Sequence, residues 1–523
     1  MLPNTLTKYI KSLSKTNLYN RRSLLNASAA IICFLILWPI FGVIGEGLNG
    51  IVSGSLDLGI DGVKQIKGSF ILVLFTSLTG GILGSANGWL LANCRFKGRK
   101  YLRLAQLLPL ATPAYLLSAT LIDIGSIHAI RIHGMFWGVL IMGFTTYPYV
   151  FLLSTESFTK CAKGQLEACR SLGVGPWKSF FKVVLPMAIP SIGAGIALTG
   201  MEVINELGAV QLLNIPSISA GIVENWVSRG NPSGAIALAF IALIIVLFLL
   251  VYEKILRRRS RRWTEGIAGG ESPAFKLEGF RAIIAITISI CPPAFTLGIP
   301  LYWISLNIGQ IKQGIDIELL EITIRSIFLG LTAALLAVFI SLFISISKRW
   351  NTNKWMQSIS FLSGIGYAIP GAVLALGLLS FSGPPWNFAP LFLLIWGYSA
   401  RFLAVSKSGL DAGFERINPN IDEAATSLGS QWIEILKRIH IPLLKGPLAV
   451  GGLLVFVDTL KELPLTFILR PFDFDTLSVR IFQYAGDERM AESIIPSVIV
   501  LSVGLIASIA LMPSLDYEEL NNN

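Results

Sequence analysis

The chain has 523 residues, of which 53% are hydrophobic and only 14% are charged, whereas soluble domains carry about 25% charged residues. This composition excludes an ordinary soluble enzyme, and uncharged runs such as residues 235–252 are long enough to cross a bilayer as helices. The net charge of +11 does not indicate a nucleic-acid partner, because the basic residues are concentrated in alternate loops.

Twelve hydrophobic stretches predict an all-α polytopic membrane protein in the lipid bilayer. In chain order, their centres lie near residues 36, 80, 114, 144, 199, 243, 292, 334, 369, 398, 456 and 502. Basic clusters at residues 95–103, 257–262 and 348–354 follow alternate stretches, which places these loops in the cytoplasm by the positive-inside rule. With an even number of spans, both termini are expected in the cytoplasm.

A polar segment of twenty residues occurs twice in the chain. Residues 167–186 read EACRSLGVGPWKSFFKVVLP, and residues 423–442 read EAATSLGSQWIEILKRIHIP. We call these the first and second repeated segments; they are offset by 256 residues. Glu206 and Glu462 share the same offset, and Pro113 and Pro370 lie within one residue of it.

The offset divides the chain into two six-helix halves, residues 1–254 and 281–523, joined by a cytoplasmic linker over residues 255–280. The core repeats within them are expected at about residues 65–252 and 321–512. Because both halves start on the same side of the membrane, they form a parallel repeat about an axis along the membrane normal.

Each repeated segment is expected to form a helix, a turn and a second helix. Residues 167–172 and 423–428 suit a short helix, and Gly173 and Gly429 suit a left-handed residue at its end. Pro176 would then open the second helix of the first segment, and Ser430 would cap that of the second. One such helix could rest on lipid headgroups, but two at matched positions favour docking two copies of one partner.

These segments resemble the "EAA" motif, E-A-A-x(3)-G-x(9)-I-x-L-P, of permease subunits in bacterial binding-protein-dependent ABC importers. The first copy departs with E-A-C and the second with I-x-I-P. The resemblance implies the type I permease fold in the bacterial plasma membrane, two ATPase subunits and an extracytoplasmic substrate-binding protein as partners. It also implies that ATPase coupling is carried by Glu167, Ala168, Gly173, Glu423, Ala424 and Gly429. No Walker A run occurs in the sequence, so we expect no catalytic residue or cofactor here and ATP on the partner subunit.

The second half contains DTLKELPLTFILRP at residues 458–471, which resembles the K-E-L-P…L-R-P signature of ferric-iron permeases. Permeases for thiamine, polyamines and phosphonates share the architecture and remain alternatives. Four acidic residues are expected in or beside the fifth and eleventh spans and could line a path for a hard cation: Glu202, Glu206, Asp458 and Glu462. Alternatively, Glu462 pairs with Lys461 or Arg470 and has only a structural role.

Other interpretations remain open at this point. Two six-span halves also fit a secondary transporter driven by an ion gradient, and a receptor or scaffold would need no transport. His128 and His133, with Asp123, lie in an expected external loop that we interpret as solvated. No resident metal site is predicted.

Overall fold

Helices form almost all of the chain in a computed structural model that describes residues 4–264, 275–309, 316–351, 353–380 and 388–520. The structure is 83% helical. Among the described residues, the sheet consists of β1 (Cys94–Arg95) paired in parallel with β2 (Phe275–Lys276). The predicted all-α polytopic fold is therefore confirmed.

The elements fall into long helices and short connecting ones. The long helices are α1 (Asn4–Ser53), α2 (Gly62–Asn93), α5 (Met135–Ser171), α7 (Leu185–Asn205), α10 (Pro232–Thr264), α13 (Ile317–Trp350), α16 (Pro390–Glu415), α19 (Ile441–Leu460) and α22 (Met490–Leu520). The short helices of the first half are α3 (Arg99–Ala105), η1 (Leu108–Ala111), α4 (Ala114–Ile127), α6 (Pro176–Ser179), η2 (Phe180–Val184), α8 (Gly208–Leu212), α9 (Ile218–Val223) and η3 (Glu224–Ser228). Those of the second half are α11 (Phe280–Pro293), η4 (Ala294–Gly298), α12 (Ile299–Leu306), α14 (Lys354–Leu362), η6 (Ile365–Ala368), α15 (Gly371–Leu379), α17 (Asn420–Ser427), α18 (Trp432–Ile435), η7 (Leu436–His440), α20 (Pro464–Leu469) and α21 (Leu477–Gly486).

Within the described residues, nine helices are long and apolar enough to span a membrane, or eleven if two bent helix pairs are counted. The bends measure 87° before α4 and 106° before α15, at the positions of Pro113 and Pro370, because a proline pushes the preceding residue out of the helical region. The remaining predicted span, the tenth in chain order with its centre near residue 398, coincides with α16. That helix is 26 residues long but carries Arg401 and Lys407, which lower its hydropathy.

The chain divides into two compact units that do not follow the sequence halves. One contains Met1–Gly42, Ile327–Tyr367 and Gly377–Leu460, and the other contains Val43–Ser326, Ala368–Leu376 and Lys461–Asn523. The first unit thus joins the start of α1 to helices of the second half: Trp396 Nε1 donates to the Leu35 carbonyl at 3.0 Å. In the second unit, α11 packs on the first half, where Gln106 donates to the Ser289 carbonyl at 2.7 Å.

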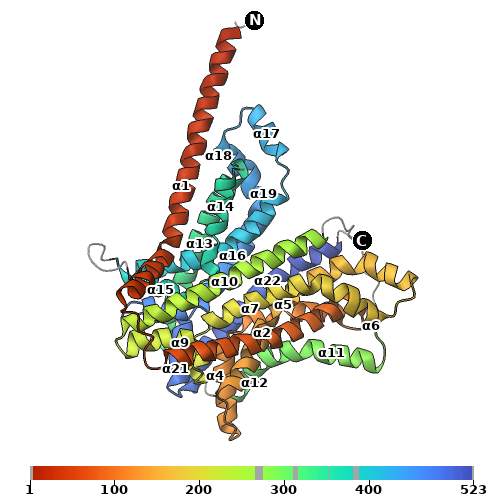
Figure 1. Cartoon of the computed structure of the whole chain (residues 1–523), viewed down its shortest axis with the longest axis vertical. Coiled ribbons are helices and arrows are strands. Elements are labelled where there is room, and N and C mark those ends of the chain that lie inside the picture. Colours follow the sequence, from red (N-terminus) through yellow and green to blue (C-terminus); the bar gives the residue numbers. More distant parts are fainter. Residues whose placement is uncertain (1–3, 265–274, 310–315, 352, 381–387, 521–523) are drawn as a thin grey trace. The chain divides into compact units, whose positions relative to one another are not determined.

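Glycines allow the helices of the larger unit to approach closely. Helices α2, α5, α7 and α10 lie side by side (Figure 1). A Cβ atom on Gly84 of α2 would lie 2.6 Å from Val150 Cβ, and one on Gly195 of α7 would lie 2.6 Å from Val150 Cα. Small residues at such crossings are typical of helices packed within membranes.

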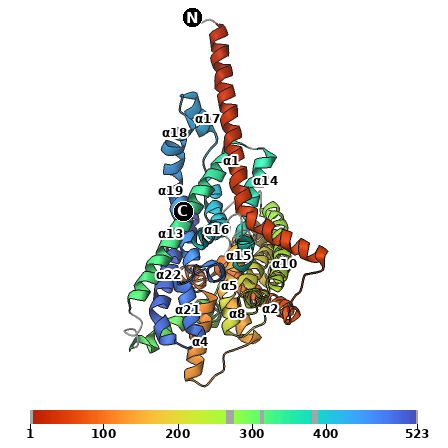
Figure 2. The same ribbon diagram turned by 90° about the vertical axis from the view of Figure 1, so that its left-hand side faces the viewer.

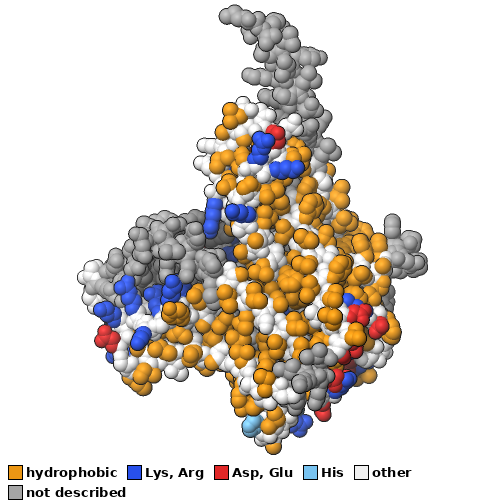
Figure 3. Space-filling view, turned by 180° about the vertical axis from the view of Figure 1, so that it is seen from behind, with side chains coloured by type: hydrophobic (Ala, Val, Ile, Leu, Met, Phe, Trp, Pro, Cys, Tyr) orange, Lys and Arg blue, Asp and Glu red, His pale blue; other side chains and the backbone are white. Residues whose placement is uncertain are grey.

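The smaller unit places the second repeated segment beyond the membrane-length helices. Figure 2 shows α17 and α18 at the end of α13 and α19. Helices α16 and α19 pack together, and Ser341 of α13 bonds Ser406 of α16 at 2.8 Å between hydroxyl oxygens. Side chains on the outer face of α13, such as Leu335 and Phe339, are more than half exposed. Figure 3 shows hydrophobic side chains over much of one face of the molecule, as a lipid-facing surface requires.

Candidate coupling segments and carboxylate cluster

The two repeated segments share one backbone turn. Gly173 and Gly429 have φ of 69° and 88°, so both occupy the left-handed region that glycine tolerates best. The amide of Val174 donates to the Cys169 carbonyl at 2.9 Å, and the amide of Ser430 donates to the Ala425 carbonyl at 3.0 Å. This is the Schellman arrangement of a helix C-terminus, and it confirms that both glycines are the left-handed residues at helix ends, as predicted.

After this turn, each segment enters the next span through the same irregular helix. Helix α6 leads into η2, and α18 leads into η7; both η2 and η7 are π-helical turns, again offset by 256 residues. Pro176 opens α6 as predicted. The predicted cap at Ser430 is wrong, because Gln431 caps α18 through a capping box with Glu434.

The segments differ in how they leave the preceding span. Helix α5 continues without interruption to Ser171, so the separate short helix predicted at residues 167–172 is wrong for the first segment. In the second, α16 ends at Glu415 and α17 starts at Asn420. Pro419, the N-cap of α17, stands where the first half has Lys163, and proline suits the start of a helix better than its interior.

The predicted coupling residues lie on the accessible side of these turns. Ala168 and Gly173 are exposed in the first segment, and Glu423, Ala424 and Gly429 are exposed in the second. Glu167 lies in the last turns of α5, but its side chain is outside the described part of the structure. The five described positions are therefore open to a partner.

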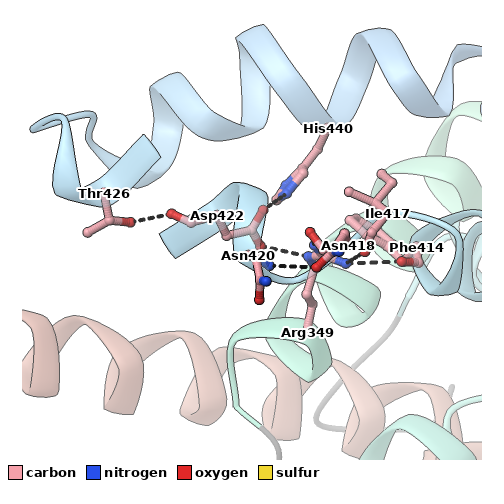
Figure 4. Close-up of polar contacts among 8 residues, drawn as sticks. All are labelled: Arg349, Phe414, Ile417, Asn418, Asn420, Asp422, Thr426 and His440. Carbon is pink, nitrogen blue, oxygen red and sulfur yellow. Dashed lines mark hydrogen bonds and ion pairs between the residues drawn. The ribbon is translucent and has the colours of Figure 1, made fainter. Parts of the chain in front are cut away.

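An Arg–Asp–His network holds the second segment to the end of α13 (Figure 4). Arg349 Nε donates to Asp422 Oδ2 at 2.7 Å, and His440 Nε2 donates to Asp422 Oδ1 at 2.9 Å. The guanidinium also donates to three backbone carbonyls at 3.0–3.3 Å, those of Phe414, Ile417 and Asn418. One arginine thus fixes both α17 and the turn that precedes it.

The network is shielded from solvent and surrounded by aromatic rings. His440 is fully buried, and its ring lies 5.3 Å from Phe414 and 6.0 Å from Trp350 between centroids. Burial raises the pKa of the Asp422 carboxyl, but the hydrogen bonds from Arg349 and His440 outweigh it, so its pKa lies below the usual range. Asp422 therefore stays ionised at neutral pH.

The first segment rests on an aromatic cluster instead. Trp89 of α2 lies 4.6 Å from Phe180 of η2, 5.5 Å from Phe158 and 6.1 Å from Phe275 between ring centroids. Val184 is fully buried in this cluster. At the 256-residue offset, Leu166 and Val184 replace Asp422 and His440. The contacts that hold the first segment are therefore apolar, whereas those that hold the second are charged.

Two of the predicted carboxylates cap short helices in equivalent places. Glu206 Oε1 accepts from the Ala209 amide at 2.9 Å, and Glu462 Oε1 accepts from the Leu465 amide at 3.1 Å. Each satisfies a backbone donor in the first turn of α8 or α20. Ser219 and Ser478 donate to the backbone carbonyls of the same two glutamates, at 2.5 and 2.8 Å. The duplication thus extends to individual hydrogen bonds.

The turns that carry these glutamates meet at Tyr115. A Cβ atom on Gly208 would lie 2.5 Å from Tyr115 Cβ and 2.7 Å from Leu463 Cδ2. Tyr115 is almost fully buried, interacts electrostatically with Glu206 and Glu462, and has a hydroxyl with no hydrogen-bond partner among the described residues. Glu206, Glu462 and Tyr115 therefore form one cluster.

The other two carboxylates are placed differently. Glu202 accepts a hydrogen bond from the Tyr149 hydroxyl at 3.1 Å and interacts electrostatically with Glu206, so it lies beside the cluster. Asp458 belongs to the smaller compact unit, on α19. Of the four predicted pathway residues, the larger unit brings together Glu202, Glu206 and Glu462.

Each half also reaches the bent third span of the other. Lys461 Nζ donates to the Leu110 carbonyl at 3.1 Å, and Asn205 Oδ1 accepts from the Gly371 amide at 2.8 Å. Asn205 and Lys461 are themselves equivalent by the repeat. Arg470, the other suggested partner of Glu462, forms an ion pair with Asp475.

Among the described residues, no group of three or more His, Cys, Asp or Glu side chains is arranged to hold a metal ion. Asp123, predicted in one external loop with His128 and His133, lies instead within α4 and accepts from Trp303 Nε1 at 2.6 Å. His128 follows α4, and its Nδ1 lies 2.9 Å from the Ile124 carbonyl. The first contact joins α4 to α12, and the second lies within one helical turn.

Several contact residues were not predicted from the sequence: Arg349, Asp422, Tyr115 and Phe275. A usable signal existed for one pair, because Asp422 and His440 are both replaced by apolar residues in the first copy. Two polar positions that change together between repeats indicate a mutual contact. Tyr115 and Phe275 have no comparable signal, since neither belongs to a pair of polar positions that change together between the repeats.

Comparison with known proteins finds sequence similarity to transport permeases. Residues 80–262 match the family described as "Binding-protein-dependent transport system inner membrane component". The chain is 25% identical over 440 residues to the Fe(3+)-transport system permease protein FbpB 2 of Haemophilus influenzae, covering 82% of this chain and 85% of the relative. It is 26% identical to the sulfate permease CysT of Escherichia coli and 27% identical to the putative 2-aminoethylphosphonate permease PhnV of Salmonella paratyphi A, each over 36% of this chain and 72% of the relative.

Proposed function

Because the chain resembles permeases of binding-protein-dependent transport and carries their membrane spans, we propose that it is the permease subunit of an ATP-driven ABC importer for ferric iron. The observation that carries the iron assignment is the relative named for Fe(3+), whose similarity extends over both halves of this chain. The sulfate and phosphonate relatives match a little over a third of it. The chain itself is a transport subunit, with ATP hydrolysis on a separate subunit.

The exposed turns at Gly173 and Gly429 support coupling to two ATPase copies. They have the same backbone geometry at equivalent places in the two halves, and a partner with two equivalent grooves needs two equivalent contacts. In this proposal both segments and both termini face the cytoplasm, and the substrate-binding protein docks on the opposite side. Closure of the ATPase dimer moves the two segments together and opens the axis between the halves.

The cluster of Glu206, Glu462 and Tyr115 is the proposed gate on the substrate path. Its two carboxylates come from equivalent positions of the two halves, as a path along the repeat axis requires. Carboxylate and phenol oxygens suit a hard cation such as Fe(III). A secondary transporter would use the same spans but has no role for the two exposed turns.

Short-time uptake of radiolabelled Fe(III) tests the function directly. Cells that lack the chain should lose uptake, and the restored wild-type chain should recover it. The double change Gly173→Val and Gly429→Val places β-branched residues in a left-handed conformation, which costs about 1–2 kcal/mol per site. We expect membrane insertion to persist while ATPase copurification and uptake fall. Retention of both would refute the coupling assignment, and iron uptake that never depends on the chain would refute the substrate.

The gate proposal is tested by Glu206→Gln and Glu462→Gln, singly and together. Glutamine keeps a side-chain oxygen for the cap but removes the charge, so folding should change little. The double variant should lower Fe(III) uptake about 10-fold or more, because polar and charged groups at membrane depth commonly line ion pathways. The matched control is the Glu→Ala pair, which also removes the cap. Normal uptake in the glutamine variants, with loss only in the alanine variants, would reduce both residues to helix caps.

A further inference from the structure

The described end of the linker between the halves is hydrogen-bonded to the end of α2. Phe275 pairs with Cys94 and Lys276 pairs with Arg95 in the parallel β1–β2 sheet. The Leu277 amide then donates to the Arg95 carbonyl at 3.0 Å. The chain is therefore attached to the first half immediately before it enters α11.

This attachment places Phe275 in the aromatic cluster against which the first repeated segment packs. Its ring lies 6.1 Å from Trp89, and the same indole lies 4.6 Å from Phe180, the first residue of η2. Phe158 closes the cluster at 5.5 Å from Trp89. The linker end and the repeated segment thus pack on one tryptophan, and neighbouring aromatic rings add about 0.5–1.5 kcal/mol per pair beyond their buried area.

The end of α2 that carries Trp89 is itself held in place. Arg99 Nε donates to the Leu91 carbonyl at 2.8 Å, and Arg99 Nη2 donates to the Ala92 carbonyl at 3.0 Å. These bonds satisfy carbonyls that a helix C-terminus leaves open. Cys94, the residue that follows α2, is buried and pairs with Phe275. The tryptophan therefore lies on a fixed helix end, and Phe275 and Phe180 both pack against it.

We propose that Phe275 is a positioning residue for coupling, so that the linker end sets the position of the first repeated segment relative to α2. In the second segment, Arg349 and Asp422 hold the equivalent position with charge. The linker thus supplies to the first half a contact that the second half makes from its own helices. This inference rests on the proposed function, because it assigns a role within the coupling of ATP hydrolysis to transport.

The test uses the full complex of this chain with its ATPase and Fe(III)-loaded binding protein in proteoliposomes. Iron uptake per ATP hydrolysed is measured for the wild type, Phe275→Ala, Phe275→Leu and Lys276→Ala. We expect Phe275→Ala to lower this ratio at least about threefold, as residues that carry coupling between distant sites commonly do. Phe275→Leu should fall between it and the wild type. Lys276→Ala, an exposed change in the same strand, should match the wild type.

A packing role alone would lower the yield or thermal stability of the complex without changing the ratio, and that result would overturn the proposal. If Phe275→Ala does not assemble, Phe275→Leu decides, and an unchanged ratio in it again overturns the proposal. A wild-type complex without ATP-dependent uptake would instead refute the proposed function. The two failures are distinguishable because the ratio is interpreted only when the wild type transports.

Discussion

The first and second repeated segments have the same turn and the same π-helical entry to the next span, yet different interactions hold them to their halves. The first rests on Trp89, Phe158 and Phe275, and the second on Arg349, Asp422 and His440. Both copies keep the exposed backbone turn that we propose contacts the ATPase. The contacts behind that surface differ, so one outer shape can be supported by apolar packing or by a partly buried ion pair.

The two supports should fail under different conditions. Apolar burial loses little when one methyl group is removed, whereas a buried ion pair becomes strongly destabilising when one partner is removed, because the other charge stays behind. The position of the second segment therefore depends on a few polar contacts, whereas that of the first depends on a broad apolar contact area. Substitutions around the second segment can distinguish the two kinds of contact, because they remove either one charge or the whole polar network.

The largest expected effect is that of Arg349→Ala. It leaves the Asp422 carboxylate and three carbonyls without their shared donor, which should destabilise the packing of the second segment by about 3 kcal/mol, the lower end of the range for a buried pair, because both side chains are partly exposed. Hydrogen exchange in lipid nanodiscs should show faster exchange over residues 420–440 only. The first segment serves as the internal control. An equal increase in exchange rate in both segments would mean that the contacts holding the two segments are not independent.

A smaller effect is expected when the whole network is changed to the residues of the first copy. The triple variant Arg349→Asn, Asp422→Leu and His440→Val should cost less than about 2 kcal/mol, because removing both charges together leaves no buried charge unpaired. The same exchange measurement checks it. The control is Asp422→Leu alone, which keeps Arg349 and should cost more than the triple variant. A triple variant as unstable as Arg349→Ala would show that the arginine acts through its three carbonyl contacts.

Much of this fold follows from hydrophobic length and from the internal repeat. The bends at Pro113 and Pro370 and the left-handed Gly173 and Gly429 are local consequences of residue type, so the sequence predicts them well. The continuous α5 was missed because the repeat alone does not show that the helix runs on through Lys163 where the second copy starts a new helix after Pro419.

The cluster at Tyr115 could be predicted only in part. Equal spacing identified Glu206 and Glu462, but it could not show that each carboxylate caps the helix that follows it. The contact with Tyr115 depends on the tertiary packing of three helical turns from two halves. Phe275 was missed for a similar reason, since a two-residue strand in a charged linker gives no periodic signal.

The start of α1 packs with helices of the second half of the chain, and this arrangement has a consequence for protein synthesis. Residues Met1–Gly42 belong with a unit that resumes at Ile327, so about 285 residues must be made before the partner helices of α1 exist. At ribosomal rates of about 5–20 residues per second, this delay is roughly 15–60 s. During that time the first part of α1 must persist in the lipid without these partners. The chain therefore completes both units only late in translation, and a ribosome that stops early releases two unfinished bodies rather than one finished half.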